Sequence, residues 1–220
     1  DGVIGNKNNE QWLKTSQSAI LLPSNQTLLE YIEKFLEKSY KTKQEITFKW
    51  KVAIQPNHLE KKLLSKILDL IPENAHLRID ANGGWTRAQA EDWANHLQEE
   101  SRLEWIEQPL EVNDINDLEK LAKKIPVALD ESLIAHPSLR YTWKSWQIRK
   151  PLLEGDPRIL LEELRTKKSF RIISTAFETG IGYRWIEHLA ALQQKGPTPR
   201  LPGLAPGWCP QTPLFSDDPQ

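Results

Sequence analysis

LEWIE (residues 103–107) is one of five short, largely apolar runs in this sequence that each end in a charged residue. The others are TFKWK (47–51), LRID (77–80), VALD (127–130) and WQIRK (146–150). Their last residues are 29, 27, 23 and 20 positions apart in turn, which is the length of one strand and one helix. Charged residues repeated at strand ends with this period predict a ring of parallel strands with its chemistry at one rim.

The overall composition fits one large globular domain. The chain has 220 residues and a net charge of −1, which gives no indication of a nucleic-acid partner or an anionic membrane surface. No apolar run approaches the 18 residues of a membrane-spanning helix. The single cysteine, Cys209, excludes an internal disulfide framework and favours a reducing, cytoplasmic location. Because the sequence contains no methionine, we expect the chain to be a piece of a longer polypeptide.

Strand-like and helix-like segments alternate along most of the chain. Capping signals mark several helix starts, such as Thr86-x-x-Gln89 and Asp156-Pro157. We expect residues 1–17 to form a linker, residues 18–205 a barrel domain and residues 206–220 an irregular tail rich in proline. The expected strands are 18–22, 46–54, 77–81, 103–107, 126–130, 146–150, 171–175 and a short one near 200–204. The expected helices are 25–35, 59–71, one that opens at Thr86, 114–124, 137–144, 158–168 and 181–194.

This alternation predicts an α/β fold with a parallel sheet, and a TIM-like (β/α)7β barrel is favoured over an open sheet. The functional-looking residues come from five successive strand ends, and a closed ring brings all of them together. An open sheet usually binds ligands only where its strand order reverses. The sequence contains no GxGxxG motif and no phosphate-binding loop of the Walker type, so a nucleotide-binding fold lacks support.

Lys49 and Lys51 are expected to point to the same face of their strand, because side chains alternate along a strand. Phe48, Trp50 and Val52 then point to the other face, beneath the helices. Two ammonium groups inside a barrel need carboxylate or substrate partners. The alternative is an edge strand with two solvent-exposed lysines, and this segment alone does not decide between them.

Asp80, Glu107 and Asp130 end three successive strands, and three neighbouring carboxylates repel one another unless a cation lies among them. Ligands that are all oxygen suit a hard ion, so the sequence predicts Mg²⁺, with Mn²⁺ as a possible substitute. An isolated aspartate in such a position is more often a helix cap. Three in succession between two lysine-bearing strands favour the metal site.

Other candidates lie toward the end of the chain. Lys150 is either part of a basic turn or a second lysine facing Lys51 across a bound substrate, where it would act in proton transfer. Ser174 and Thr175 precede a glycine-containing segment and are candidates for binding a substrate carboxylate, although Thr179-Gly180 could simply start a helix.

The five histidines are expected on helix faces or in loops and share no ligand spacing, so a histidine-based zinc site is not expected.

These residues resemble the motifs of the enolase superfamily, muconate-lactonizing subgroup. The matching segments, in order, are Lys49-Trp50-Lys51, Asp80-Ala81-Asn82, Trp105-Ile106-Glu107-Gln108-Pro109, Leu129-Asp130-Glu131-Ser132, Lys150-Pro151 and Ser174 to Gly182. Each motif alone is weak, but six in the same order and spacing are specific for the superfamily. Within it the chain most resembles the o-succinylbenzoate synthase family, through SAILLPS (18–24), the run Arg78 to Asn82, and Trp85.

The resemblance implies a reaction and a role for each residue. The reaction is the syn-dehydration of 2-succinyl-6-hydroxy-2,4-cyclohexadiene-1-carboxylate (SHCHC) to 2-succinylbenzoate in menaquinone and phylloquinone biosynthesis. Lys51 would remove the proton alpha to the carboxylate, Lys150 would stabilise the enediolate from the other face, and Lys49 would help to neutralise the carboxylate. Mg²⁺ on Asp80, Glu107 and Asp130 would take up charge as the enediolate forms. The remaining roles are substrate contact for Arg78, Ser174 and Thr175, and support of the metal ligands for Asn82 and Glu131.

Members of this family carry an N-terminal α+β capping domain before the barrel, whose loops close over the substrate. Residues 1–17 are too few to form one, so we expect a chain in which this domain is truncated or lost. Two alternatives remain open. One is an N-acylamino-acid racemase or dipeptide epimerase of the same superfamily, which would use Lys51 and Lys150 on opposite faces. The other is a barrel fragment that has no catalytic activity without a separate capping chain.

Overall fold

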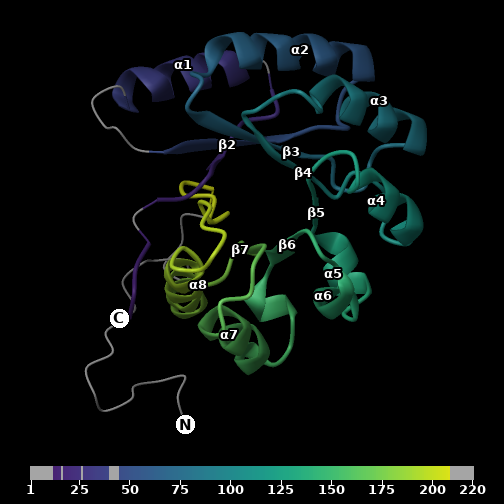
Figure 1. The fold of residues 1–220 in the computed structure, drawn as a ribbon. Coiled ribbons are helices and arrows are strands. Elements are labelled where there is room, and N and C mark those ends of the chain that lie inside the picture. The colour runs from purple at the N-terminus through teal and green to yellow at the C-terminus, as the bar shows by residue number, and fades with distance from the viewer. Residues whose placement is uncertain (1–11, 16, 26, 40–44, 209–220) are drawn as a thin grey trace. The chain divides into compact units, whose positions relative to one another are not determined.

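The structure is a computed structural model, and it describes residues 12–15, 17–25, 27–39 and 45–208 (Figure 1). The described residues form two compact units. One unit runs from Ala19 to Arg149, and the other combines the residues up to Ser18 with those from Lys150 onward. Most of the predicted linker lies outside the described residues. So does most of the predicted tail, including Cys209. The domain boundaries at 18 and 205 therefore stay predictions.

The first unit is a parallel sheet whose strands pair in chain order, with helices between them. Each of β1 to β5 pairs in parallel with the next strand along the chain. The elements are β1 (Ile20–Leu21), α1 (Leu28–Ser39), β2 (Ile46–Lys51), α2 (Asn57–Leu70), β3 (Ala75–Asp80), α3 (Arg87–Leu97), β4 (Leu103–Glu107), α4 (Ile115–Leu121), β5 (Val127–Leu129), α5 (Glu131–Ala135), α6 (Leu139–Thr142) and β6 (Trp146–Arg149). The predicted alternation of strands and helices is confirmed.

The two faces of β2 differ as the alternation of its side chains predicts. Phe48 and Trp50 are buried on the face that α1, α2 and α3 cover in Figure 1. The ring of Phe48 packs edge-on against Phe35 of α1 at 5.7 Å, and the ring of Trp50 lies 6.2 Å from that of Trp93 in α3. Since β2 pairs with β1 on one side and β3 on the other, it is not an edge strand. This pairing removes the alternative of two lysines on an exposed edge.

A β-bulge interrupts the pairing of β3 with β4. Leu77 pairs with Leu103, but Arg78 pairs with Trp105, so Glu104 is the extra residue. Beyond the bulge the register is regular again, and Asp80 pairs with Glu107. A bulge places two consecutive side chains against one residue of the neighbouring strand. Glu104 and Trp105 therefore both lie beside Arg78, on the face opposite the helix-covered apolar core.

Helix starts follow the predicted capping chemistry. The Thr86 hydroxyl accepts from the backbone N–H of Gln89, whose side chain accepts from the N–H of Thr86, so the predicted capping box is present. The Asp156 side chain accepts from the backbone N–H of Arg158 at the start of α7 (Pro157–Arg165), and Pro157 is the first residue of that helix. These contacts satisfy backbone donors that have no partner within the helix.

Several predicted boundaries are wrong. β2 ends at Lys51 instead of residue 54, because Ala53 has a left-handed φ of 61° that no strand continues through. Asp130 lies just beyond β5, at the N-cap position of the unpredicted α5. Lys150 lies just beyond β6, before a 3₁₀ turn, η1 (Pro151–Leu153). His76 lies inside β3, not in a loop or on a helix.

The second unit holds η1, α7, β7 (Arg171–Ile173) and α8 (Gly180–Gln193). Apolar residues of α7 and α8 pack with Ile173 in a core of their own. The segment near 200–204 is not a strand. It makes one isolated parallel bridge, between Gly203 and Ser174. Among the described residues, no helix is both long enough and apolar enough to cross a membrane.

Candidate metal and proton-transfer site

Three of the predicted charged strand ends lie side by side in the sheet. Lys51 pairs with Asp80, and Asp80 pairs with Glu107, so the ends of β2, β3 and β4 are in register. Asp130 directly follows β5, which is the next strand of the sheet. The three acidic residues are 1 to 2% exposed. The structure thus brings together the predicted carboxylates at the carboxyl edge of the sheet.

Lys49 links two of these carboxylates. Its Nζ lies 2.9 Å from Asp80 Oδ2 and 2.6 Å from Glu107 Oε1. Burial by itself would lower the pKa of Lys49, but the Asp80 and Glu107 carboxylates outweigh it, and the pKa is raised above its usual value. Lys49 is therefore a permanent cation in the physiological pH range. It is suited to neutralising negative charge and unsuited to accepting a proton.

The two paired carboxylates have opposite pKa shifts. Burial, and then repulsion by Asp80, raise the pKa of Glu107 to about 7, and Lys49 offsets only part of this rise. Burial would also raise the pKa of Asp80, but attraction to Lys49 outweighs it and the pKa is lowered. Asp130 adds to the repulsion felt by Glu107. The pKa of Glu107 is therefore raised by its burial and by the negative charge of two acidic neighbours.

Lys51 is the accessible lysine of the pair. Its side chain is 41% exposed, compared with 16% for Lys49. Its Nζ lies 3.8 Å from Asp80 Oδ2 and donates to Asn82 Oδ1 at 2.9 Å. Asn82 in turn donates from Nδ2 to Glu131 Oε1 at 2.9 Å. Asn82 and Glu131 therefore join the Lys51 amine to the segment that follows Asp130.

Gln108 is a supporting residue that we did not single out from the sequence. Its side chain is fully buried and accepts from the backbone N–H groups of Asp130 and Ser132 at 3.2 and 3.1 Å. It also donates to the carbonyl oxygen of Leu110 and to the Ser132 hydroxyl. Its φ of 36° is unusual for a residue with a side chain. The available signal was its place in the Glu107-Gln108-Pro109 motif.

Glu60 is a second such residue. It is 3% exposed, and its carboxylate accepts from the N–H groups of Ala53, Ile54 and Gln55 at 3.0 Å each. These residues follow Lys51, so Glu60 fixes the turn that leads away from the lysine. An acidic residue in the first turn of the following helix was the only signal in the sequence.

Arg78 precedes Asp80 by two residues in β3, so the two side chains point to the same face of the strand. It is 1% exposed, its Nε donates to Glu104 Oε2 at 2.5 Å, and its guanidinium lies 4.1 Å from the centre of the Trp105 ring. The bulge in β4 makes both contacts possible. The role of Arg78 as a substrate contact stays a prediction, and the structure shows a guanidinium already engaged by protein groups.

The other predicted site residues belong to the second unit. Lys150 is half-buried at the start of η1. The Ser174 hydroxyl donates to the carbonyl oxygen of Gly203 at 3.1 Å, and the Thr175 hydroxyl donates to Glu178 Oε2 at 2.5 Å. Thr179 precedes the first residue of α8, so the alternative of a helix start at Thr179-Gly180 is correct. The substrate contacts of Ser174 and Thr175 stay predictions.

The residues of the first unit fit a hard divalent cation. They offer three buried carboxylates, and burial followed by their mutual repulsion raises the pKa of Glu107; a cation would relieve this repulsion. Glu131 Oε2 is also buried without a hydrogen-bond partner among the described residues. No soft ligand lies among these groups, so the donor set favours Mg²⁺ or Mn²⁺ over zinc.

Known proteins share this sequence pattern. An o-succinylbenzoate synthase of Thermosynechococcus vestitus is 32% identical over 77% of this chain and 54% of its own length. The solved o-succinylbenzoate synthase of Thermosynechococcus elongatus, with magnesium in its active site, superposes with a TM-score of 0.75 at 29% identity, over 94% of this chain and 66% of its own. MenC of Desulfotalea psychrophila gives a TM-score of 0.70 at 26% identity, over 94% and 58%.

The likeness covers only part of these relatives. The chain spans about half the length of the curated relatives it matches. A family model described as enolase C-terminal domain-like matches residues 32–144, which is 113 of the 220 residues. This range contains the lysines of β2 and all three carboxylates. The predicted α/β barrel class and the predicted superfamily are therefore confirmed, and the chain belongs to the enolase C-terminal domain-like family.

Proposed function

We propose that this protein is an o-succinylbenzoate synthase that dehydrates SHCHC to 2-succinylbenzoate with the help of Mg²⁺. The observation that carries the proposal is the row Lys51, Asp80 and Glu107 at consecutive strand ends, with Lys49 bridging the two carboxylates. Relatives at 29 to 32% identity bear this enzyme name, and one of them is described with magnesium in its active site.

The proposed reaction removes a proton and a hydroxyl group from the same face of the ring. The Lys51 amine takes the proton from the carbon alpha to the carboxylate, and the C–O bond to the ring hydroxyl then breaks. The proton on Lys51 passes to the departing hydroxide, which leaves as water, and the electron pair of the broken C–H bond completes the aromatic ring. The exposure of Lys51 and its hydrogen bond to Asn82 support this role, since the amine is both accessible and held in place.

The other residues would bind and neutralise. Asp80, Glu107 and Asp130 would hold Mg²⁺, which would supply positive charge beside the substrate carboxylate. Lys49, a permanent cation, would add further positive charge beside Asp80 and Glu107. Lys150 would stabilise the negative charge of the deprotonated substrate from the other ring face. Menaquinone or phylloquinone biosynthesis, a cytoplasmic location and a separate capping domain as partner stay predictions.

Turnover of SHCHC in excess Mg²⁺ tests the proposal directly. We expect Lys51→Ala to lower kcat by about 10²–10⁴-fold, the usual contribution of a positioned acid–base group. Lys66→Ala is the matched control, because Lys66 is exposed on α2, away from the carboxyl edge of the sheet. Equal rates for wild type and Lys51→Ala would remove Lys51 as the base.

A second assay separates the alternatives. Solvent deuterium exchange into an N-acylamino acid without any turnover of SHCHC would favour the racemase reaction and overturn the proposal. Binding of Mg²⁺ with neither exchange nor turnover would show a barrel that is inactive by itself. Addition of a separately expressed capping domain from a relative then tests whether the catalytic groups are competent once covered.

A further inference from the structure

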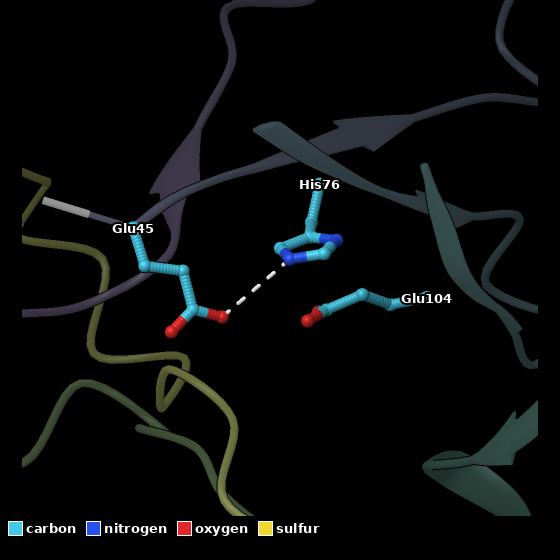
Figure 2. A group of neighbouring side chains, drawn as sticks. All are labelled: Glu45, His76 and Glu104. Carbon is cyan, nitrogen blue, oxygen red and sulfur yellow. Dashed lines mark ion pairs between the residues drawn. The ribbon is translucent and has the colours of Figure 1, made fainter. Parts of the chain in front are cut away.

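A second group of metal-binding side chains lies at the opposite ends of the same strands. Glu45 precedes β2, His76 is the second residue of β3, and Glu104 is the bulge residue of β4. One oxygen or nitrogen atom from each of the three lies within 4.8 Å of the others. Figure 2 shows the carboxylate of Glu45 and the imidazole of His76 facing each other, with the carboxylate of Glu104 beside them.

This group is separate from the three carboxylates at the carboxyl edge. Glu45 and Lys51 are six residues apart along β2, which corresponds to about 20 Å in an extended strand. The two groups also differ in chemistry, because only this one includes an imidazole. His76 Nε2 lies 3.7 Å from Glu45 Oε1, a distance at which the two atoms attract without a direct hydrogen bond.

A neighbouring side chain provides an independent indication of a ligand. Thr47 is fully buried, and its hydroxyl has no hydrogen-bond partner within the part of the chain that the structure describes. It pairs with His76 across β2 and β3, so the two side chains lie next to each other on the same face of the sheet. A buried hydroxyl without a partner is costly and calls for a missing polar group. A water molecule bound to a metal at this place would supply that group.

Glu104 is oriented in the way that metal-binding carboxylates commonly are. Its Oε2 accepts from Arg78 Nε, which fixes the direction of the carboxylate. Metal ligands are usually held by such hydrogen bonds from groups behind them. Glu45 is the movable member, because its side chain is 43% exposed. Donor atoms around a tetrahedral zinc ion are about 3.4 Å apart, so the group has to contract slightly on binding, and the exposed Glu45 is free to move toward the ion.

We propose that Glu45, His76 and Glu104 form a second metal site, specific for a transition metal such as Zn²⁺ and structural in role. One imidazole nitrogen and two carboxylate oxygens, with a water molecule held by Thr47, make a four-ligand set that suits Zn²⁺ or Co²⁺ better than Mg²⁺. The ion would tie together the amino ends of β2, β3 and β4. It would leave the lysines and carboxylates at the other end untouched.

Titration with Co²⁺ in excess Mg²⁺ tests this site, since Mg²⁺ occupies the hard oxygen site and Co²⁺ reports an imidazole ligand by its visible absorption. We expect wild type to take up one Co²⁺ per chain, and His76→Gln to bind it at least tenfold more weakly. His58→Gln is the matched control, because His58 is exposed on α2. Uptake of Co²⁺ by His76→Gln equal to that of wild type would overturn the proposal, as would no uptake by wild type.

Two further variants keep the test decisive if His76→Gln does not fold. Glu45→Gln changes an exposed side chain, so it should fold, and we expect it to weaken Co²⁺ binding several-fold. Thr47→Val keeps the shape and removes the hydroxyl, and a smaller loss of affinity is expected. Unchanged affinity in both variants contradicts the site. SHCHC turnover by these variants should equal that of wild type, so failure of this site and failure of the proposed enzyme activity are distinguishable.

Discussion

Lys49 Nζ lies 2.6 Å from Glu107 Oε1, although the two residues are 58 positions apart in the chain. Adjacent parallel strands, in register beyond the bulge of β4, bring them together, with Asp80 between them. Because the ammonium group lies within contact of two buried carboxylates, it stabilises a charge arrangement that would otherwise repel itself. The contribution of this pair to the free energy of unfolding can be measured directly.

Replacement of Lys49 by methionine should destabilise the protein most when no metal is present. The change leaves two buried carboxylates without their cation, and breaking a buried ion pair costs about 3 kcal/mol. We expect this loss of unfolding free energy in urea denaturation, and a smaller loss in excess Mg²⁺, because the ion replaces part of the missing charge. Lys62→Met, on an exposed part of α2, is the control. An equal loss with and without Mg²⁺ would contradict a metal beside Lys49.

The stability of the metal-free protein should fall as the pH rises through about 7. The pKa of Glu107 is raised from 4.5 to about 7 in the folded state, so between these values the folded state holds a proton that the unfolded state has released. The stabilisation is complete below about pH 4.5 and is lost as the pH passes the folded pKa, by about 1–3 kcal/mol. The lowered pKa of Asp80 acts only in more acidic solution.

Thermal unfolding between about pH 5 and 8 measures this effect. As the pH rises over this range, the Tm of the wild type should fall, whereas Glu107→Gln lacks this contribution because glutamine does not titrate. The difference in Tm between the two proteins should therefore shrink or reverse. Excess Mg²⁺ should reduce the slope of the wild type, since the ion binds the ionised carboxylate. A wild-type slope that equals that of Glu107→Gln in the absence of metal would show that Glu107 is ionised throughout.

Removal of the Gln108 side chain should loosen the segment that carries Asp130. Gln108→Ala leaves the N–H groups of Asp130 and Ser132 without their buried acceptor, which costs about 1–3 kcal/mol for each unsatisfied group. We expect lower stability and weaker Mg²⁺ binding, measured by denaturation and by isothermal titration. Gln98→Ala, at the exposed end of α3, should change neither.

Gly84→Ala should disturb the turns beside the site in a way that a second change repairs. A Cβ added at Gly84 would lie 2.7 Å from the Cβ of Ala53, the residue held by Glu60 after Lys51. We expect a destabilisation of about 1–3 kcal/mol from overpacking. Ala53→Gly removes the opposing atom and also suits the left-handed φ of 61° at that position, so the double variant should recover most of the loss. A double variant no better than Gly84→Ala would show that the contact is not the cause.

The sequence was sufficient to predict the row of charged strand ends, because it depends on two regular quantities. Each strand and helix pair has a limited length, so the spacing of the apolar runs predicts the repeat. Side chains alternate along a strand, so Lys49 and Lys51 separate from Phe48 and Trp50. The register of Lys51 with Asp80 and Glu107 confirms both inferences.

Features that depend on side chains meeting across the fold were not predictable from one sequence. Glu60 and Gln108 act by accepting hydrogen bonds from backbone groups of other segments, and their weak local signals, a place in a helical first turn and in a short motif, do not reveal these partners. The expectation that no histidine takes part in a zinc site stays a prediction, and the proposed site at His76 would overturn it. Its partners Glu45 and Glu104 are 31 and 28 positions away and come from two other segments.

The single extra residue in β4 gives the strand one more interior side chain without moving its end. If Glu104 were deleted, Leu103 and Trp105 would become consecutive, and the strand would alternate regularly with Trp105 still beside Arg78 and Glu107 still beside Asp80. The deletion would instead remove the carboxylate that accepts from Arg78 Nε. The bulge therefore acts as an insertion that the sheet absorbs locally: it adds an acidic group next to a buried guanidinium and leaves the alignment of the carboxyl edge unchanged.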